Sequence, residues 1–247
     1  VNRIGLAVIG QSEGLAPADK KLYALRDVTG TVDSIPLIAS SVMSKKLASG
    51  AQAILLDVKV GSGAFMKTID DARALAKAMV DIGRENGRSV KAVLTDMDRP
   101  LGHAIGNALE IREVIDTLKG HGPEDLTHEC IIMAAHMLVL SHICDYETAL
   151  TRVREALDSG AALERLRLMI DAQGGNSSVI DDESLLAIGQ CTYDVIAPKS
   201  GYITHMNTEQ CGIASVMLGA GRTIKDGPID YLSLIHISEP TRLGMIS

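Results

Sequence analysis

The chain has 247 residues, which is enough for one large domain or two smaller ones. Its composition, 46% hydrophobic and 22% charged, is typical of a globular protein, and its formal charge of −7 argues against a nucleic-acid-binding surface. We expect no membrane partner, because no apolar run is long enough to span a bilayer. No signal peptide opens the sequence and the cysteines lack CxxC spacing, so we expect a cytoplasmic protein with reduced thiols.

The first 30 residues are predicted to form a strand, a helix and a turn. Residues 1–10 are interpreted as a strand that ends in a turn. The helix has Pro17 in its first turn and Asp19 near the positive end of its dipole. We expect this helix to end near Arg26 and residues 27–30 to form the turn that follows it.

A second helix is predicted between Ser34, as its N-cap, and Gly50, just after its last turn. Pro36 suits the first turn of this helix, where its missing N–H costs nothing. One face mixes two aliphatic side chains with a hydroxyl and an ammonium, which is unusual for a core helix. This face is formed by Ile38, Ser41, Val42 and Lys45.

This face has the groups to hold a small, flat, polar ring. Lys45 would donate to a carbonyl oxygen, and Ser41, which both donates and accepts, would meet a ring N–H. Arg26 would supply a second cation. The apolar faces of the ring would be covered by Ile38, Val42 and Phe65. The alternative, which spacing alone favours, is a surface lysine beside a half-buried helix and an arginine in a salt bridge.

A parallel βαβ unit is predicted next. Residues 53–60 are nearly continuous apolar, as a buried strand is, and they lead into a glycine loop at residues 61–66. A helix capped by Thr68 follows, and residues 90–95 form a second short strand. Ligands of parallel sheets lie beyond the carboxyl ends of the strands, where this glycine loop and residues 96–106 are expected.

The segment from Pro100 to Glu113 enters a helix through glycines, with Asn107 as a candidate cap. Exposed carbonyls followed by a carboxylate one or two turns later have the oxygen chemistry that a hard cation prefers. His103 is interpreted as a loop histidine. The alternative, which physical reasoning alone favours, is an ordinary junction between a loop and a helix.

The rest of the chain is predicted to be helical up to about Ile170 and strand-like later. Residues 131–140 are apolar nearly all round and are expected to form a buried helix. His136 lies on that helix, and a hydrogen-bonded core or rim role is expected for it. After a polar linker, residues 191–204 show the alternation of strands and a turn.

Two stretches together resemble one family. Residues 26–66, with RDVTGTVDSIPLI and DVKVGSGAFM, are similar to the thymidine phosphorylase and pyrimidine-nucleoside phosphorylase family, and PLGxAxGNALExxE at residues 100–113 is similar to its pyrimidine-nucleoside phosphorylase branch. The resemblance extends to about Tyr231 and implies an α/β fold of the nucleoside phosphorylase type. Its parts would be a partial helical domain, an α/β domain with a largely parallel sheet and the start of a small C-terminal α+β domain. The expected segments are 1–14 (a strand of the α/β domain), 15–50 (helical domain), 51–172 (α/β domain), 173–190 (linker), 191–231 (C-terminal domain) and 232–247 (a non-native tail).

The resemblance also implies roles for individual residues. The base would be bound by Arg26, Ser41 and Lys45, with Ile38, Val42 and Phe65 as the pocket wall. A potassium ion would be held by the carbonyls of Leu101 and Ala104 and by the carboxylate of Glu113. The implied partners are a pyrimidine nucleoside, inorganic phosphate as co-substrate and a second copy of the chain in a homodimer.

The implied reaction is the phosphorolysis of uridine, thymidine or deoxyuridine to the free base and (deoxy)ribose 1-phosphate, in nucleoside salvage. Arg26 and Lys45 are cations that would stabilise the negative charge that develops on the departing base, so we treat them as catalytic.

The sequence departs from the family pattern at one point, and two alternative functions remain. The family's phosphate loop, KxSxGGxGD, is not found, so we expect a fragment that lacks both ends and is inactive. One alternative is an enzyme similar to anthranilate phosphoribosyltransferase, although the diphosphate loop and acidic metal ligands that it needs are not found either. The other is a truncated, non-catalytic product that binds bases weakly or only dimerises.

Overall fold

The computed structural model describes residues 1–10, 14–31, 33–186, 193–197, 199–220, 235–237 and 245–246; for residues 26–28 and 245–246 it describes the backbone alone. The helices are α1 (Pro17–Thr29), α2 (Ile35–Ala48), α3 (Ile69–Glu85), α4 (Asn107–Leu118), α5 (Glu124–Leu140), α6 (Tyr146–Asp158), α7 (Ala161–Ala172) and α8 (Thr208–Met217), with 3-10 turns η1 (Ser177–Ile180) and η2 (Glu183–Leu185). The strands are β1 (Ala53–Val60), β2 (Ser89–Asp96), β3 (Ala104–Ile105), β4 (Gly201–Tyr202), β5 (Ile235–His236) and β6 (Met245–Ile246).

The chain divides into two compact units that alternate along the sequence. One unit comprises residues 8–97 and 130–153, and the other comprises residues 1–7, 98–129 and 154–247. The expected segments were consecutive, and their boundaries stay predictions. Within the described residues, every helix is too short or too polar to traverse a lipid bilayer.

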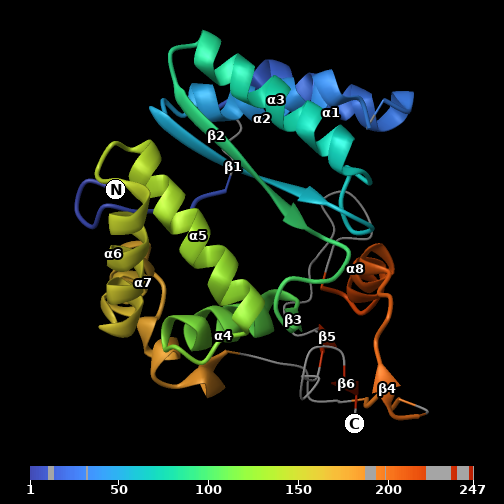
Figure 1. Ribbon diagram of the computed structural model, residues 1–247, viewed down its shortest axis with the longest axis vertical. Helices are drawn as coiled ribbons and strands as arrows, with labels where there is room; N and C mark the ends of the chain where they lie inside the picture. The colour runs from blue at the N-terminus through green and yellow to red at the C-terminus, as the bar shows by residue number, and fades with distance from the viewer. Residues whose placement is uncertain are drawn as a thin grey trace. The chain divides into compact units, whose positions relative to one another are not determined.

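The unit that contains residues 8–97 is built on a parallel strand pair. β1 pairs with β2 from Ala53 opposite Ser89 to Val60 opposite Asp96, and α3 makes the crossover between them. Figure 1 shows α2 and α3 on the same face of this pair, with α1 beside them. The predicted parallel βαβ unit and the α/β class are therefore confirmed.

The hydrophobic core of this unit lies between α2, α3 and the strand pair. Alternate residues of β1 point into it, as a strand with one covered face requires. Its buried members are Ile38, Ala39, Met43, Ile54, Leu56, Val58, Met66, Ala72, Leu75, Ala76, Met79 and Val90. Gly83 lets α3 approach β2 closely, because a Cβ built on it would lie 2.2 Å from Val90 Cγ2.

Local signals mark several helix ends, although Ser34, at the predicted N-cap of α2, makes no side-chain capping bond. Thr68 caps α3, and its Oγ1 accepts a bond from the Asp71 N–H (3.2 Å). Pro36 lies in the first turn of α2, and Gly50 follows its end with a φ of +78°. Gly30 ends α1 in the left-handed conformation, so the helix includes most of the predicted turn at residues 27–30.

Four predictions were wrong. Asn107 was expected to cap α4, but it is the first residue of that helix, and Gly106 lies at the cap position. Residues 1–10 form a turn and irregular chain instead of a strand, with Ile9 83% exposed. Helix α5 is not a buried helix, since Ala135 is its one buried residue in the part of the chain that the structure describes. Residues 193–197 are irregular, and among its described residues the predicted strand region contributes only the two-residue β4.

The unit that contains α4 has two short antiparallel pairs, β3 with β5 and β4 with β6. Helix α8 was not predicted from the sequence; Asn207 caps it by accepting the Gln210 N–H (3.1 Å). Cys191 and most of the expected tail at residues 232–247 lie outside the described residues.

Candidate functional site

Lys45 and Ser41 meet on α2, as their spacing of four residues predicts. The Lys45 ammonium Nζ donates to the Ser41 hydroxyl Oγ at 2.9 Å. Ser41 is buried, and the Lys45 side chain is 25% exposed. The hydroxyl and the ammonium therefore form one polar group at the edge of the hydrophobic core.

The same ammonium contacts α1. Nζ of Lys45 donates to Oδ2 of Asp19 at 2.8 Å, and Asp19 is only 9% exposed. Nζ also lies 6.0 Å from the centroid of the Tyr23 ring, at the outer range of a cation–π contact. Sequence reasoning missed both residues of α1. Their spacing of four puts them on one face of that helix, but it does not say which element the face meets.

The side chain of Arg26 lies outside the described residues. Its backbone belongs to α1, seven residues after Asp19, and therefore on the same face of the helix as Asp19. The expected approach of the Arg26 guanidinium to Lys45 stays a prediction.

The three expected wall residues differ in exposure. Ile38 is buried in the core at 8% exposure, whereas Val42 is half-buried and packs against the same core. Phe65 is 62% exposed in the glycine loop. That loop is closed by bonds from the Gly61 N–H to the Met66 carbonyl (3.0 Å) and from the Gly63 N–H to the Met97 carbonyl (2.9 Å). Phe65 therefore has free surface on an ordered loop.

Glu113 organises the second candidate site, in the unit that contains α4. Its Oε1 accepts the backbone N–H groups of His103 (2.7 Å) and Ala104 (3.1 Å). A Cβ at Gly102, which has a φ of +70°, would lie 2.3 Å from Oε2 of the same carboxylate. The loop at residues 102–104 thus closes around the Glu113 carboxylate, and glycine is required at the closest approach.

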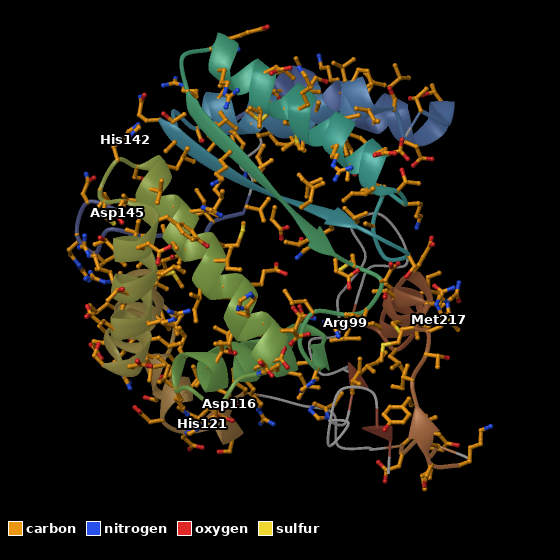
Figure 2. All side chains as sticks on the ribbon, viewed as in Figure 1. Arg99, Asp116, His121, His142, Asp145 and Met217 are labelled. Atoms are coloured by element: carbon orange, nitrogen blue, oxygen red, sulfur yellow. The ribbon has the colours of Figure 1, made fainter. Side chains whose placement is uncertain are left out.

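A hollow of about 270 Å³ adjoins this carboxylate. It has a polar lining that includes His103, Glu113, Asp116, His121 and Glu183. Figure 2 shows Asp116 and His121 close together by α4, and the His121 N–H donates to the Asp116 carbonyl (2.8 Å). Among the described residues, no three His, Cys, Asp or Glu side chains are grouped as a transition-metal site would need.

Hard cations prefer oxygen ligands, and Glu113 supplies one carboxylate, of which two loop amides hold one oxygen. The residues expected to hold potassium, Leu101, Ala104 and Glu113, thus lie on one loop and the helix that it enters. Whether the two carbonyls and the carboxylate share an ion stays a prediction.

A larger hollow, of about 500 Å³, lies between α3 and β2. Its apolar floor includes Val80, Val90 and Leu94, and its rim carries Arg73, Lys77, Asp81, Arg84 and Lys91. None of the residues expected in the base site or the cation site lines it.

Outside the expected site, a lysine of β2 contacts a histidine of α5. The Lys91 ammonium lies 3.0 Å from Nδ1 of His136, whose ring stacks on Tyr146 with the centroids 4.9 Å apart. Burial lowers the pKa of His136 below its usual value, and the nearby Lys91 charge lowers it further. The expected rim role for His136 agrees with this geometry.

The comparisons with known proteins concern most of the chain. Residues 1–163 match the model of the glycosyl transferase family, a/b domain. Proteins named pyrimidine-nucleoside phosphorylase from Staphylococcus aureus strains bovine RF122 / ET3-1, USA300 and NCTC 8325 / PS 47 are each 56% identical over 231 residues, which are 93% of this chain and 53% of each relative. The chain spans about half the length of the curated relatives it matches. By its match to this a/b domain, the chain belongs to the glycosyl transferase family.

Proposed function

We propose that this chain carries the base-binding part of a pyrimidine-nucleoside phosphorylase, which cleaves the bond between a pyrimidine and its sugar with inorganic phosphate. The observation that carries the proposal is the contact between the Lys45 ammonium and the Ser41 hydroxyl on one helix face. The name shared by the 56% identical relatives supports the same reaction. A phosphoribosyltransferase like that for anthranilate is not favoured, since these relatives do not carry that name.

The chemistry follows from where charge develops. Phosphate attacks C1′ of the nucleoside, the bond from C1′ to N1 breaks, and the base departs with the electron pair. Negative charge then spreads over O2 and O4 of the ring. Lys45 and Arg26 are cations that would meet these oxygens, so they would bind the transition state more tightly than the substrate.

The donors and acceptors favour a ring with carbonyl oxygens. The Ser41 oxygen accepts one bond from Lys45 and keeps a lone pair for a ring N3–H, while the ammonium needs an acceptor. Uracil and thymine offer an N3–H beside two carbonyls. Cytosine offers an unprotonated N3 and an amino group, so we propose uridine, deoxyuridine and thymidine as substrates.

The cation is proposed to be potassium, bound by the carbonyls of Leu101 and Ala104 and by Glu113. The support is the carboxylate that two loop amides already orient. When bound, the ion supplies positive charge that holds the loop against α4. Inorganic phosphate is proposed as the co-substrate and a second copy of the chain as the partner, which size-exclusion chromatography with light scattering would test.

Two measurements test the proposal. The release of uracil or thymine from uridine or thymidine, with and without phosphate, is followed by absorbance, and the binding of uracil, thymine and cytosine is measured by calorimetry. We expect phosphate-dependent release and binding of uracil and thymine but not cytosine. Binding without release would favour the non-catalytic alternative, and equal binding of all three bases would contradict the proposed site.

A further inference from the structure

Asp19 is a buried carboxylate on the first turn of α1, and its best-defined contact leads to another helix. Its Oδ2 accepts from Nζ of Lys45 at 2.8 Å, across 26 residues of sequence. The side chain of Asp19 is 9% exposed and that of Lys45 is 25% exposed. An ion pair covered to this extent is screened by solvent far less than a surface pair.

The donors of the ammonium can be counted. A lysine ammonium has three N–H bonds in a tetrahedral arrangement and no acceptor. Asp19 takes one N–H at 2.8 Å, and the Ser41 hydroxyl takes a second at 2.9 Å. Two fixed bonds determine the direction of the third N–H, which has no acceptor within the part of the chain that the structure describes. That N–H remains available for an external acceptor.

We propose that Asp19 is a positioning residue that orients the Lys45 ammonium toward a carbonyl oxygen of the pyrimidine base. This inference rests on the proposed function. Without Asp19, the four-carbon side chain of Lys45 would be held only by Ser41 and would sample more rotamers before binding. With Asp19 in place, that ordering is complete before the base arrives, so less binding free energy is lost.

The competing explanation is structural: Asp19 stabilises α1 through the helix dipole and joins α1 to α2. A matched control exists in Asp70, an acidic residue of the first turn of α3 whose side chain is 88% exposed. Asp19→Asn keeps the shape and an acceptor oxygen but removes the charge, and Asp70→Asn makes the same change at a helix start away from Lys45.

The first experiment needs no ligand. The free protein is acetylated with limiting acetic anhydride, and mass spectrometry compares Lys45 with the exposed Lys46 beside it. We expect Asp19→Asn to raise the ratio of Lys45 to Lys46 acetylation about fivefold, because the charged acceptor is lost. Asp70→Asn should leave the ratio unchanged. An unchanged ratio in Asp19→Asn would overturn the claim that Asp19 holds the ammonium.

The second experiment measures uracil affinity by NMR titration in the Asp19→Asn and Asp70→Asn variants. We expect Asp19→Asn to weaken binding about tenfold and Asp70→Asn to leave it unchanged, because only Asp19 contacts the Lys45 ammonium. Unchanged uracil affinity in Asp19→Asn, or an equal loss in both variants, would overturn the inference. If the unaltered chain binds no uracil, the proposed function and the base-binding claim are both overturned, while the acetylation ratio still decides whether Asp19 orients Lys45.

Discussion

In the strand-pair unit, Ser41 and Lys45 lie on a helix that packs into the hydrophobic core, whereas the residues of the second candidate site lie on a loop and on the helix that the loop enters. Ser41 and Lys45 project from α2, which is held by Ile38, Ala39 and Met43 in the hydrophobic core. The loop before α4 is held by hydrogen bonds to the Glu113 carboxylate.

The functional groups of α2 are positioned by packing, whereas the loop before α4 is positioned by hydrogen bonds. Packing restrains α2 through many weak contacts, so losing one of them moves the helix little. The loop before α4 has less redundancy, since two of its amides share one carboxylate and lose that charged acceptor together. We therefore expect mutations of Lys45 to change chemistry with the fold retained, and mutations of Glu113 to change both.

The largest expected effect is that of Lys45→Ala on base binding, which we expect to be abolished. Removing a charge-assisted donor to the base costs about 1.5–3 kcal/mol of binding free energy. Calorimetry with uracil measures the loss, and circular dichroism checks that the helices remain, since Asp19 loses a partner. Lys46→Ala on the exposed side of α2 is the control and should bind normally. Unchanged affinity in Lys45→Ala would refute the pocket.

Glu113→Ala should destabilise the unit that contains α4. Two backbone amides lose a charged acceptor, which we expect to cost about 2–3 kcal/mol in the free energy of unfolding. Urea denaturation measures the loss, and Glu110→Ala, which removes a single bond to the Gly106 N–H (2.9 Å), should cost less. Potassium should raise the melting temperature of the unaltered chain more than sodium does, and Glu113→Ala should remove that difference. Equal effects of the two ions would count against the cation site.

Gly83→Ala tests whether packing in the hydrophobic core holds α2 in place. In an open helix this change stabilises, but here the new Cβ would lie 2.2 Å from Val90 Cγ2 and 3.1 Å from Met43 Cε. We expect a loss of about 1–3 kcal/mol in the free energy of unfolding, because the core must shift to admit a methyl group. Uracil affinity should change little if redundancy of contacts holds α2 in place. A large loss of affinity at full stability would contradict this view of α2.

The smallest expected effect is the pH dependence due to His136. Its pKa is lowered in the folded state, so below the ordinary value of 6.5 the unfolded chain binds more protons than the folded chain. Stability should therefore fall as the pH drops from 7 toward 5, and this part should vanish in His136→Gln. Denaturation at several pH values measures it. A pH profile that is identical in the variant would show that His136 contributes nothing.

The sequence predicted best where a signal is local. The bounds of β1 match the predicted strand, and Thr68, Pro36 and Gly50 lie at helix ends where their conformational preferences put them. It failed where an element depends on a partner. Residues 1–10 had the composition of a strand, and residues 131–140 were apolar enough for a core helix, but pairing and burial are supplied by other segments.

By itself, the sequence determined the parallel βαβ unit and the face of α2 that joins Ser41 to Lys45, because helical spacing brings residues four apart together. Only the tertiary structure decided that Asp19 meets Lys45, since that contact depends on how α1 packs beside α2. The same holds for the burial of Asp19, which turns an ordinary acidic residue of a first turn into a strong acceptor. Spacing specifies neighbours within one element, whereas packing between elements selects the partner of a charge.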